Sequence, residues 1–150
     1  MPTVPPEKIE PKSLNDYLDV MSKSVFQSGM SWKVIAKKWP GTREAFQDFD
    51  IHTVADFDEH DIEKLMQDPR VVRNFRKLNA VVFNAGKMLE LDKEYGSFQK
   101  YLRSHGSFDA ALNAIRQDFK FMGPSGIYAF LYIVGEEVIP HDEFERIYKK

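Results

Sequence analysis

The sequence predicts an all-α protein built as a single helical domain, and three observations support this fold class. Apolar residues recur at three- and four-residue spacing through most of the chain from Ser13 onward. Alternating apolar and polar runs between hairpin turns, which would predict strands, are missing. The 150 residues, 43% hydrophobic and 13% aromatic, are enough to build one core and exclude wholesale disorder.

The composition also excludes several functional classes. The chain has no cysteine, so it can form no disulfide, thiolate nucleophile or cysteine-based zinc site. No apolar run is long enough to span a bilayer, and the N-terminus lacks the order of a signal peptide. We therefore expect a cytoplasmic protein with no membrane contact. Because the formal net charge is −2, binding of nucleic acid would require a local cationic surface.

Residues 1–12 hold four of the eight prolines and show no periodicity. We therefore expect an extended arm in front of one helical domain over residues 13–150. Ser13 is the expected N-cap of the first helix. That helix should run from Leu14 to about Ser28 and end at Gly29.

A second helix is predicted from Ser31 to about Trp39, because Pro40 has no backbone donor and should end it. Thr42 is then the expected cap of a short helix in TREAFQDF. Asp58 is the expected cap of another short helix, in DEHDIEKLMQ. Further short helices are expected in HTVADF, SFQKYLRSH and SFDAALNAIRQD, the last two capped by serines.

The most regular helical pattern is RVVRNFRKLNAVVFNAGKMLEL, residues 70–91. Pro69 falls in its first turn, where proline is tolerated. At about 100° per residue, Arg73, Arg76 and Lys77 are expected on the face opposite the apolar stripe. That stripe consists of Val71, Phe75, Leu78, Val82, Ala85 and Leu89.

Residues 111–135, ALNAIRQDFKFMGPSGIYAFLYIVG, predict two helices joined by a short hairpin. The second helix is strongly apolar, opens with Pro124 and runs from Ser125 to Val134. Gly123 can adopt a positive φ, and Gly126 permits close backbone approach. Free N–H groups at the start of this helix would suit a DNA phosphate, although an ordinary helix corner explains the same residues.

Trp32 follows a predicted helix break and has the small neighbours Ser28, Gly29 and Ser31. This space would let a flipped-out base stack on the indole, with a cation–π attraction of roughly 0.5–2 kcal/mol for a cationic base. The alternative is a tryptophan buried in the core, which we expect for Trp39.

Cationic residues cluster in the first half of the chain and could hold a phosphate backbone. The alternative is a solvated helix face without a ligand. The cluster comprises Lys33, Lys37, Lys38, Arg43, Arg70, Arg73, Arg76 and Lys77.

His141 and Glu145 are four residues apart on an expected C-terminal helix, a spacing that can chelate a metal. Two ligands do not make a site, and the other histidines have no matching partners nearby in the sequence. We therefore expect no metal and no cofactor. Asp142 is a candidate general base.

The segment FQSGMSWKVIAKKWPGTREAFQDFD resembles the signature of the DNA-3-methyladenine glycosylase I family, a Gln-Ala-Gly-Leu-Ser-Trp turn followed by a helix and a Phe-x-x-Phe-Asp ending. The matching residues are Gln27, Gly29, Ser31, Trp32, Phe46, Phe49 and Asp50. LMQDPRVVRNFRKLNAVVFNA matches at Gln67, Asp68, Arg73, Lys77, Ala80, Asn84 and Ala85. FKFMGPSGIYAFLYIVG is similar to the family's helix–hairpin–helix, and the match runs in order from about Leu14 to Asp142.

The resemblance implies an all-α, helix–hairpin–helix DNA glycosylase-like fold, with a base pocket between two helical lobes. It implies a monomer that acts on double-stranded DNA carrying a damaged base, with Trp32 stacking the flipped base. The pocket would be lined by Ser24, Gln27, Ser28, Gly29 and Ser31. DNA would be held by Lys120, Phe121, Met122, Gly123, Pro124, Ser125, Gly126, Arg73 and Lys77.

The departures from the family pattern concern chemistry. The family's pocket glutamate, eight residues before the tryptophan, is Ser24 here. His141 matches a zinc ligand of the family, but Glu145 stands where a cysteine is expected. The chain also starts after the family's segment with pocket tyrosines and two further ligands, so we expect the zinc site to be lost. The superfamily often places a catalytic aspartate after the hairpin, and Asp142 is our candidate for that role.

Three functions remain open. The first is a DNA N-glycosylase that hydrolyses the N-glycosidic bond of alkylated bases such as 3-methyladenine. The second is a catalytically inactive module that binds DNA or lesions, and the third is a protein-interaction domain. N3-alkylated adenine is cationic and becomes neutral when it leaves, so little general acid is needed. The enzyme is therefore the preferred prediction, with altered specificity or weaker activity because of Ser24.

Overall fold

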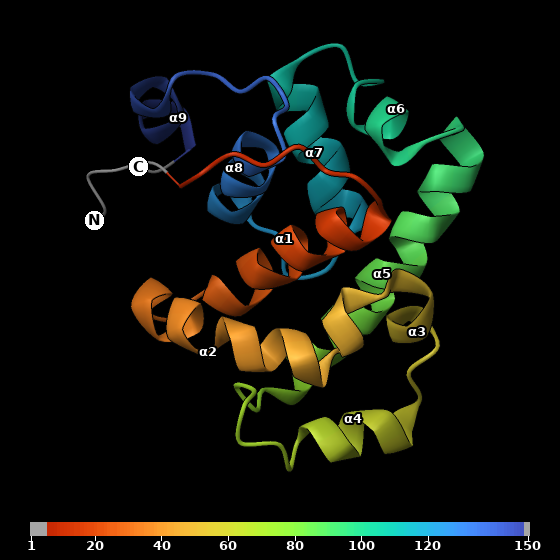
Figure 1. Cartoon of the computed structure of the whole chain (residues 1–150). Helices are drawn as coiled ribbons and strands as arrows, with labels where there is room; N and C mark the ends of the chain where they lie inside the picture. Colours follow the sequence, from red (N-terminus) through yellow and green to blue (C-terminus); the bar gives the residue numbers. More distant parts are fainter. Residues whose placement is uncertain (1–5, 149–150) are drawn as a thin grey trace.

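The computed structural model describes residues 6–148, and every regular element in that range is helical (Figure 1). This confirms the all-α prediction. The α-helices are α1 (Leu14–Gln27), α2 (Trp32–Ala45), α3 (Ile51–Ala55), α4 (Glu59–Leu65), α5 (Phe75–Tyr95), α6 (Phe98–Leu102), α7 (Phe108–Asp118), α8 (Pro124–Ile133) and α9 (His141–Tyr148), with a 3₁₀ turn, η1, at Gln47–Phe49. No helix in this part of the chain is long and apolar enough to cross a membrane.

Helix α1 lies between two groups of helices, as Figure 1 shows. Helices α2, α3 and α4 lie on one side of it and α7, α8 and α9 on the other, while the long α5 runs along the edge of both groups. Helix α1 contacts α2 and α3 on the first side, α8 on the second, and α5. The two predicted lobes therefore meet along α1.

The core is formed by apolar faces of these helices, with Leu18, Met21 and Val25 of α1 fully buried at its centre. Trp39 is 3% exposed and stacks on Phe49, their ring centroids 5.4 Å apart. Its indole N–H donates a hydrogen bond of 2.8 Å to the Asp19 carboxylate. The prediction that Trp39 belongs to the core is confirmed.

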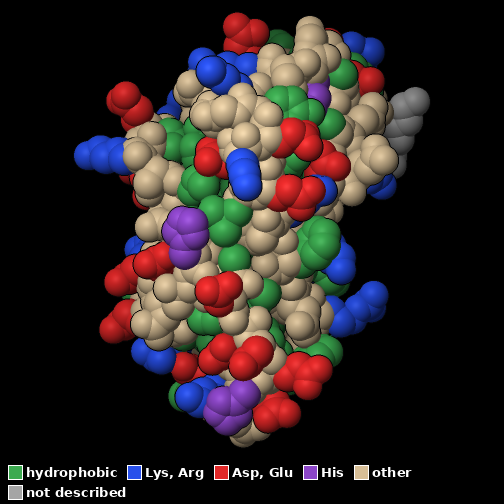
Figure 2. Space-filling view, turned by 90° about the vertical axis from the view of Figure 1, so that its right-hand side faces the viewer, with side chains coloured by type: hydrophobic (Ala, Val, Ile, Leu, Met, Phe, Trp, Pro, Cys, Tyr) green, Lys and Arg blue, Asp and Glu red, His purple; other side chains and the backbone are tan. Residues whose placement is uncertain are grey.

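One end of the molecule is acidic. Figure 2 shows several acidic side chains at the lower end, which α4 forms in Figure 1, and others over the upper half of the same face. The predicted cap of α4 is confirmed, because Asp58 and Asp61 form a reciprocal capping box. An anionic ligand is therefore expected on another face. The acidic residues of this segment are Asp58, Glu59, Asp61 and Glu63.

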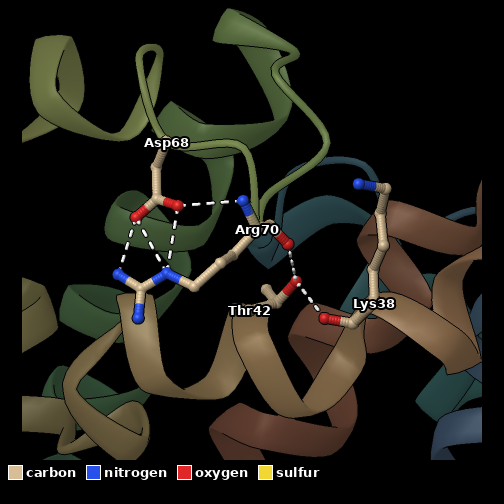
Figure 3. Close-up of polar contacts among 4 residues, drawn as sticks. All are labelled: Lys38, Thr42, Asp68 and Arg70. Carbon is tan, nitrogen blue, oxygen red and sulfur yellow. Dashed lines mark hydrogen bonds and ion pairs between the residues drawn. The ribbon is translucent and has the colours of Figure 1, made fainter.

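The second helix is longer than predicted, and the expected break at Pro40 was wrong. Helix α2 continues through Pro40 to Ala45, so Thr42 lies inside it rather than capping a new helix. The Thr42 hydroxyl instead lies 2.9 Å from the carbonyl of Lys38 and 3.2 Å from that of Arg70 (Figure 3). Trp39, Thr42 and Ala45 are buried along one face, and this burial outweighs the backbone hydrogen bond that proline removes.

The long helix also differs from its prediction. It begins at Phe75, where the Asn74 side chain accepts from the Lys77 backbone N–H, and not at Pro69. The preceding turn is held by Arg70, whose guanidinium donates to the Asp68 carboxylate at 2.7 Å (Figure 3). The stripe was wrong in part because Phe75 is 59% exposed. The buried face comprises Lys77, Leu78, Ala80, Val81, Asn84, Ala85, Met88 and Leu91.

The described part of the N-terminal arm, residues 6–12, has no helix or strand. It contacts α8, because the Ile9 N–H donates to the Ile133 carbonyl at 2.8 Å and the Lys8 ammonium lies 4.7 Å from the centre of the Tyr132 ring. The remainder of the predicted arm, residues 1–5, lies outside the described residues.

Candidate functional site

The turn between α1 and α2 presents Trp32 at the surface. Gly29 has φ +72°, a left-handed conformation that glycine adopts without strain. Ser31 then caps α2, its hydroxyl accepting from the Val34 N–H. Trp32 is the first residue of α2 and is 44% exposed, so the core alternative for this tryptophan is excluded.

Ser24 lies one turn before the end of α1 and is 5% exposed. It faces the start of α8, because a Cβ placed on Gly126 would lie 3.6 Å from the Ser24 Cβ. Two predicted site residues from distant segments are therefore neighbours. Of the other predicted pocket residues, Gln27 is half-buried and Ser28 is exposed at the end of α1.

Lys77 does not lie on the exposed face of α5, and that part of the prediction was wrong. The side chain is 5% exposed, and its ammonium donates to the carbonyl of Phe26 at 3.2 Å and to that of Ser28 at 2.5 Å. These carbonyls end α1, where a cation is favoured. Burial lowers the pKa of Lys77 below its usual value. Lys77 therefore ties α5 to the turn that leads to Trp32, and Arg73 remains exposed.

The hairpin between α7 and α8 is fixed to α5 by one buried amide. Asn84 is 1% exposed, accepts from the Lys120 N–H at 2.8 Å and donates to the Lys120 carbonyl at 3.0 Å. The sequence matched Asn84 to the family motif without assigning it this role. A lone amide among the apolar residues of a helix is the signal that could have suggested it.

The left-handed residue of the hairpin is Phe121, with φ +57°, whereas Gly123 has an ordinary φ of −86°. The expectation of a positive φ at Gly123 was therefore wrong. Met122 is buried at 3% exposure, whereas its neighbour Phe121 is 39% exposed. Lys120, Gly123 and Ser125 are exposed, and Pro124 and Gly126 are half-buried.

Asp142 is exposed in the first turn of α9. The pKa of Tyr128 on α8 is raised mainly by burial, next by the nearby Tyr132, and then by the charge of Asp142. The Nε2 atom of His141 lies 3.3 Å from a carboxylate oxygen of Glu145. Between residues 6 and 148 there is no group of three or more histidine or carboxylate side chains that could hold a metal ion.

The fold is all-helical, Trp32 is exposed at the start of α2, and α7 and α8 are joined by a hairpin. These are the features that the resemblance to helical DNA glycosylases implies. Known proteins support this class: a family model described as methyladenine glycosylase matches residues 12–117. The chain belongs to the methyladenine glycosylase family.

Curated relatives include DNA-3-methyladenine glycosylase 1 of Escherichia coli (strain K12) and DNA-3-methyladenine glycosylase of Haemophilus influenzae. Each is 28% identical over 130 residues, which cover 73% of this chain and 70% of the relative. Among solved structures, that of 3-methyladenine DNA glycosylase I from Staphylococcus aureus, which concerns the recognition of 3-methyladenine, matches with a TM-score of 0.76 and 29% sequence identity. The match covers 86% of this chain and 80% of the Staphylococcus aureus chain. The structure of a Tyr-to-Phe mutant of 3-methyladenine DNA glycosylase I in complex with 3-methyladenine is also similar, with a TM-score of 0.76 and 28% sequence identity. The match covers 86% of this chain and 81% of the mutant's chain.

Proposed function

We propose that this protein is a DNA N-glycosylase that removes 3-methyladenine or a related alkylated base from double-stranded DNA. Its family and the activities of its relatives support this function. The observation that carries the proposal is the contrast between the two tryptophans. Trp39 fills the core at 3% exposure, whereas Trp32 starts a helix with 44% of its surface free to meet a base.

The flipped base stacks on Trp32 in this proposal. A base alkylated at N3 is a cation, and its attraction to an indole face is worth roughly 0.5–2 kcal/mol. Water adds to the sugar carbon C1′, the N-glycosidic bond breaks, and its electron pair goes to the base nitrogen. The base leaves neutral, and an abasic sugar with a C1′ hydroxyl remains. The proton lost by water goes to Asp142, the proposed general base.

Residues of the hairpin hold the DNA backbone. The exposed Lys120 supplies a positive charge, and the first N–H groups of α8, at Ser125 and Gly126, have no partner within the helix. Arg73 adds a second exposed cation. We further propose that the protein acts as a monomer in the cytoplasm, and light scattering of the purified protein with and without duplex DNA tests the monomer.

A catalytically inactive module that binds lesions is the second candidate, and Ser24 is the observation that favours it. A neutral hydroxyl contributes about 0.5–1.5 kcal/mol to a hydrogen bond, against about 1.5–3 kcal/mol for a charged partner. Serine in place of the family's glutamate therefore weakens recognition of a cationic base, while the stacking residue Trp32 is kept.

The deciding experiment incubates the protein with methylated duplex DNA and measures free base by liquid chromatography and mass spectrometry. The enzyme releases 3-methyladenine above the buffer control, and Trp32→Ala abolishes most of that release. Val34→Ala is the matched control, because Val34 lies on the same helix and is 42% exposed. Absence of release, with retained affinity for duplex DNA, would replace the enzyme with the binding module.

A further inference from the structure

A groove lies between the first turns of α5 and the hairpin, with a volume of about 540 Å³. It is lined by Phe75, Arg76, Asn79, Ala80, Lys120 and Phe121. Neither Trp32 nor Ser24 lines it. The groove is therefore a different feature from the proposed base pocket.

The groove carries unusually exposed aromatic side chains. Phe75 is 59% exposed and Phe121 39%, and the adjoining Phe83 is 43% exposed. Arg76 and Phe83 are seven residues apart on α5 and so share one face of that helix. The left-handed backbone of Phe121 costs roughly 1–2 kcal/mol in a non-glycine residue, and Asn84 holds the adjacent backbone in place. Exposed apolar clusters of this kind mark binding surfaces.

Positive charge accompanies these rings. The Lys120 ammonium lies 4.3 Å from the centre of the Phe83 ring, and the Arg76 guanidinium carbon lies 5.9 Å from the centre of the Phe121 ring. None of the six lining residues is acidic. Phe75 is 59% exposed and so remains open to solvent. An occupant that fits must offer both a flat ring and a negative charge.

We propose that this groove binds an unpaired nucleotide of a DNA strand, with its base stacked on Phe75 and its phosphate paired with Lys120 and Arg76. A cationic groove with aromatic platforms is how proteins hold single-stranded nucleic acid without sequence preference. The groove continues directly from the hairpin, through Lys120 and Phe121. The inference rests on the proposed function in one respect, that DNA is the ligand.

Fluorescence anisotropy of the full chain with a dye-labelled thymidine 12-mer tests the groove. Stacking of one base is worth about 1–3 kcal/mol, so Phe75→Ala should raise the Kd about 5- to 150-fold. Phe75→Trp should restore affinity because it restores a ring. Tyr95→Ala should leave the Kd within twofold, since Tyr95 is an exposed aromatic residue on α5 about 30 Å further along the helix.

Charge is tested on the same strand. The slope of log affinity against log salt should fall by about 0.7 in Lys120→Gln, the value for one phosphate contact on a single strand. A Kd for Phe75→Ala within twofold of the wild type, at an unchanged melting temperature, would overturn the proposal and leave the groove to a protein partner. An unchanged salt slope in Lys120→Gln would overturn the assigned phosphate contact.

Base release from methylated duplex, measured with the same variants, separates this inference from the glycosylase assignment. If strand binding depends on Phe75 but no base is released, the nucleotide-binding groove is supported and the glycosylase function is rejected. If base is released but strand binding does not depend on Phe75, the glycosylase function is supported and the nucleotide-binding groove is rejected.

Discussion

Replacing Lys77 by methionine tests how the turn before Trp32 is held. Methionine keeps much of the apolar stem of lysine and removes the ammonium that donates to the carbonyls of Phe26 and Ser28. Ser28 is exposed, so water can replace the lost donor there. Phe26 is 1% exposed, and its carbonyl would lose a buried donor.

The cost follows from that one carbonyl. A buried acceptor left without a donor costs about 1–3 kcal/mol. For a domain of this size, each kcal/mol shifts the melting temperature by roughly 2–4 °C. Lys77→Met should therefore lower the melting temperature by about 2–12 °C. The turn should also loosen, so the Kd for 3-methyladenine should rise together with the loss of stability.

Thermal and urea unfolding followed by circular dichroism measure the effect. Lys87→Met is the matched control on the same helix, because the Lys87 ammonium only approaches the exposed Glu90 carboxylate at 3.4 Å. Such a surface pair contributes about 0–1 kcal/mol. If Lys77→Met unfolds with the same free energy as Lys87→Met, the buried ammonium does not hold the turn and the reasoning fails.

Three further predictions concern the pocket, the hairpin and alkaline stability. Ser24→Glu should lower the Kd for 3-methyladenine about 5- to 30-fold, because a charged acceptor adds about 1–2 kcal/mol. Titration calorimetry measures this Kd, and Ser24→Gln is the uncharged control. Equal affinities of the two variants would place residue 24 outside the pocket. Gly123→Ala should leave duplex affinity unchanged, because its Cβ would meet no described atom within 4 Å. Gly123→Asp should weaken duplex affinity about fivefold by repelling phosphate, by about 1 kcal/mol, and equal anisotropy curves would contradict the hairpin's role. Burial and the hydrogen bond to Asp118 raise the pKa of Tyr101 above 10. The folded state therefore keeps the phenol proton that the unfolded chain loses, and the free energy of unfolding should fall as the pH rises above 10. Urea unfolding should show a less steep fall in Tyr101→Phe.

Local signals in the sequence located most helices. Ser97 and Ser107 cap α6 and α7 through their side chains, as predicted, and Gly29 ends the α1 turn with a positive φ. Such signals act over one or two helical turns, so the sequence is enough to recognise them. The ordered family motifs added the class of fold, which local signals do not determine.

Long-range packing overrode local propensity in three places. Helix α2 passes through Pro40 because Trp39 and Ala45 are buried on either side of it. Lys77 lies inside because the carbonyls of α1, about fifty positions earlier in the chain, need a donor. Phe121 is left-handed because the amide of Asn84, on another helix, fixes the adjacent backbone. Each outcome depends on a partner that sequence spacing does not reveal.

The sequence by itself determined the helical class, the family and the two candidate features of the site, Trp32 and the hairpin. Only the tertiary structure decided that Ser24 meets Gly126 and that Lys77 is a buried tie rather than a surface cation. It also placed Phe75 and Phe121 around one cationic groove. The physical reason is that caps and periodicity are local, whereas burial and hydrogen-bond partners are set by segments that meet only in the folded chain.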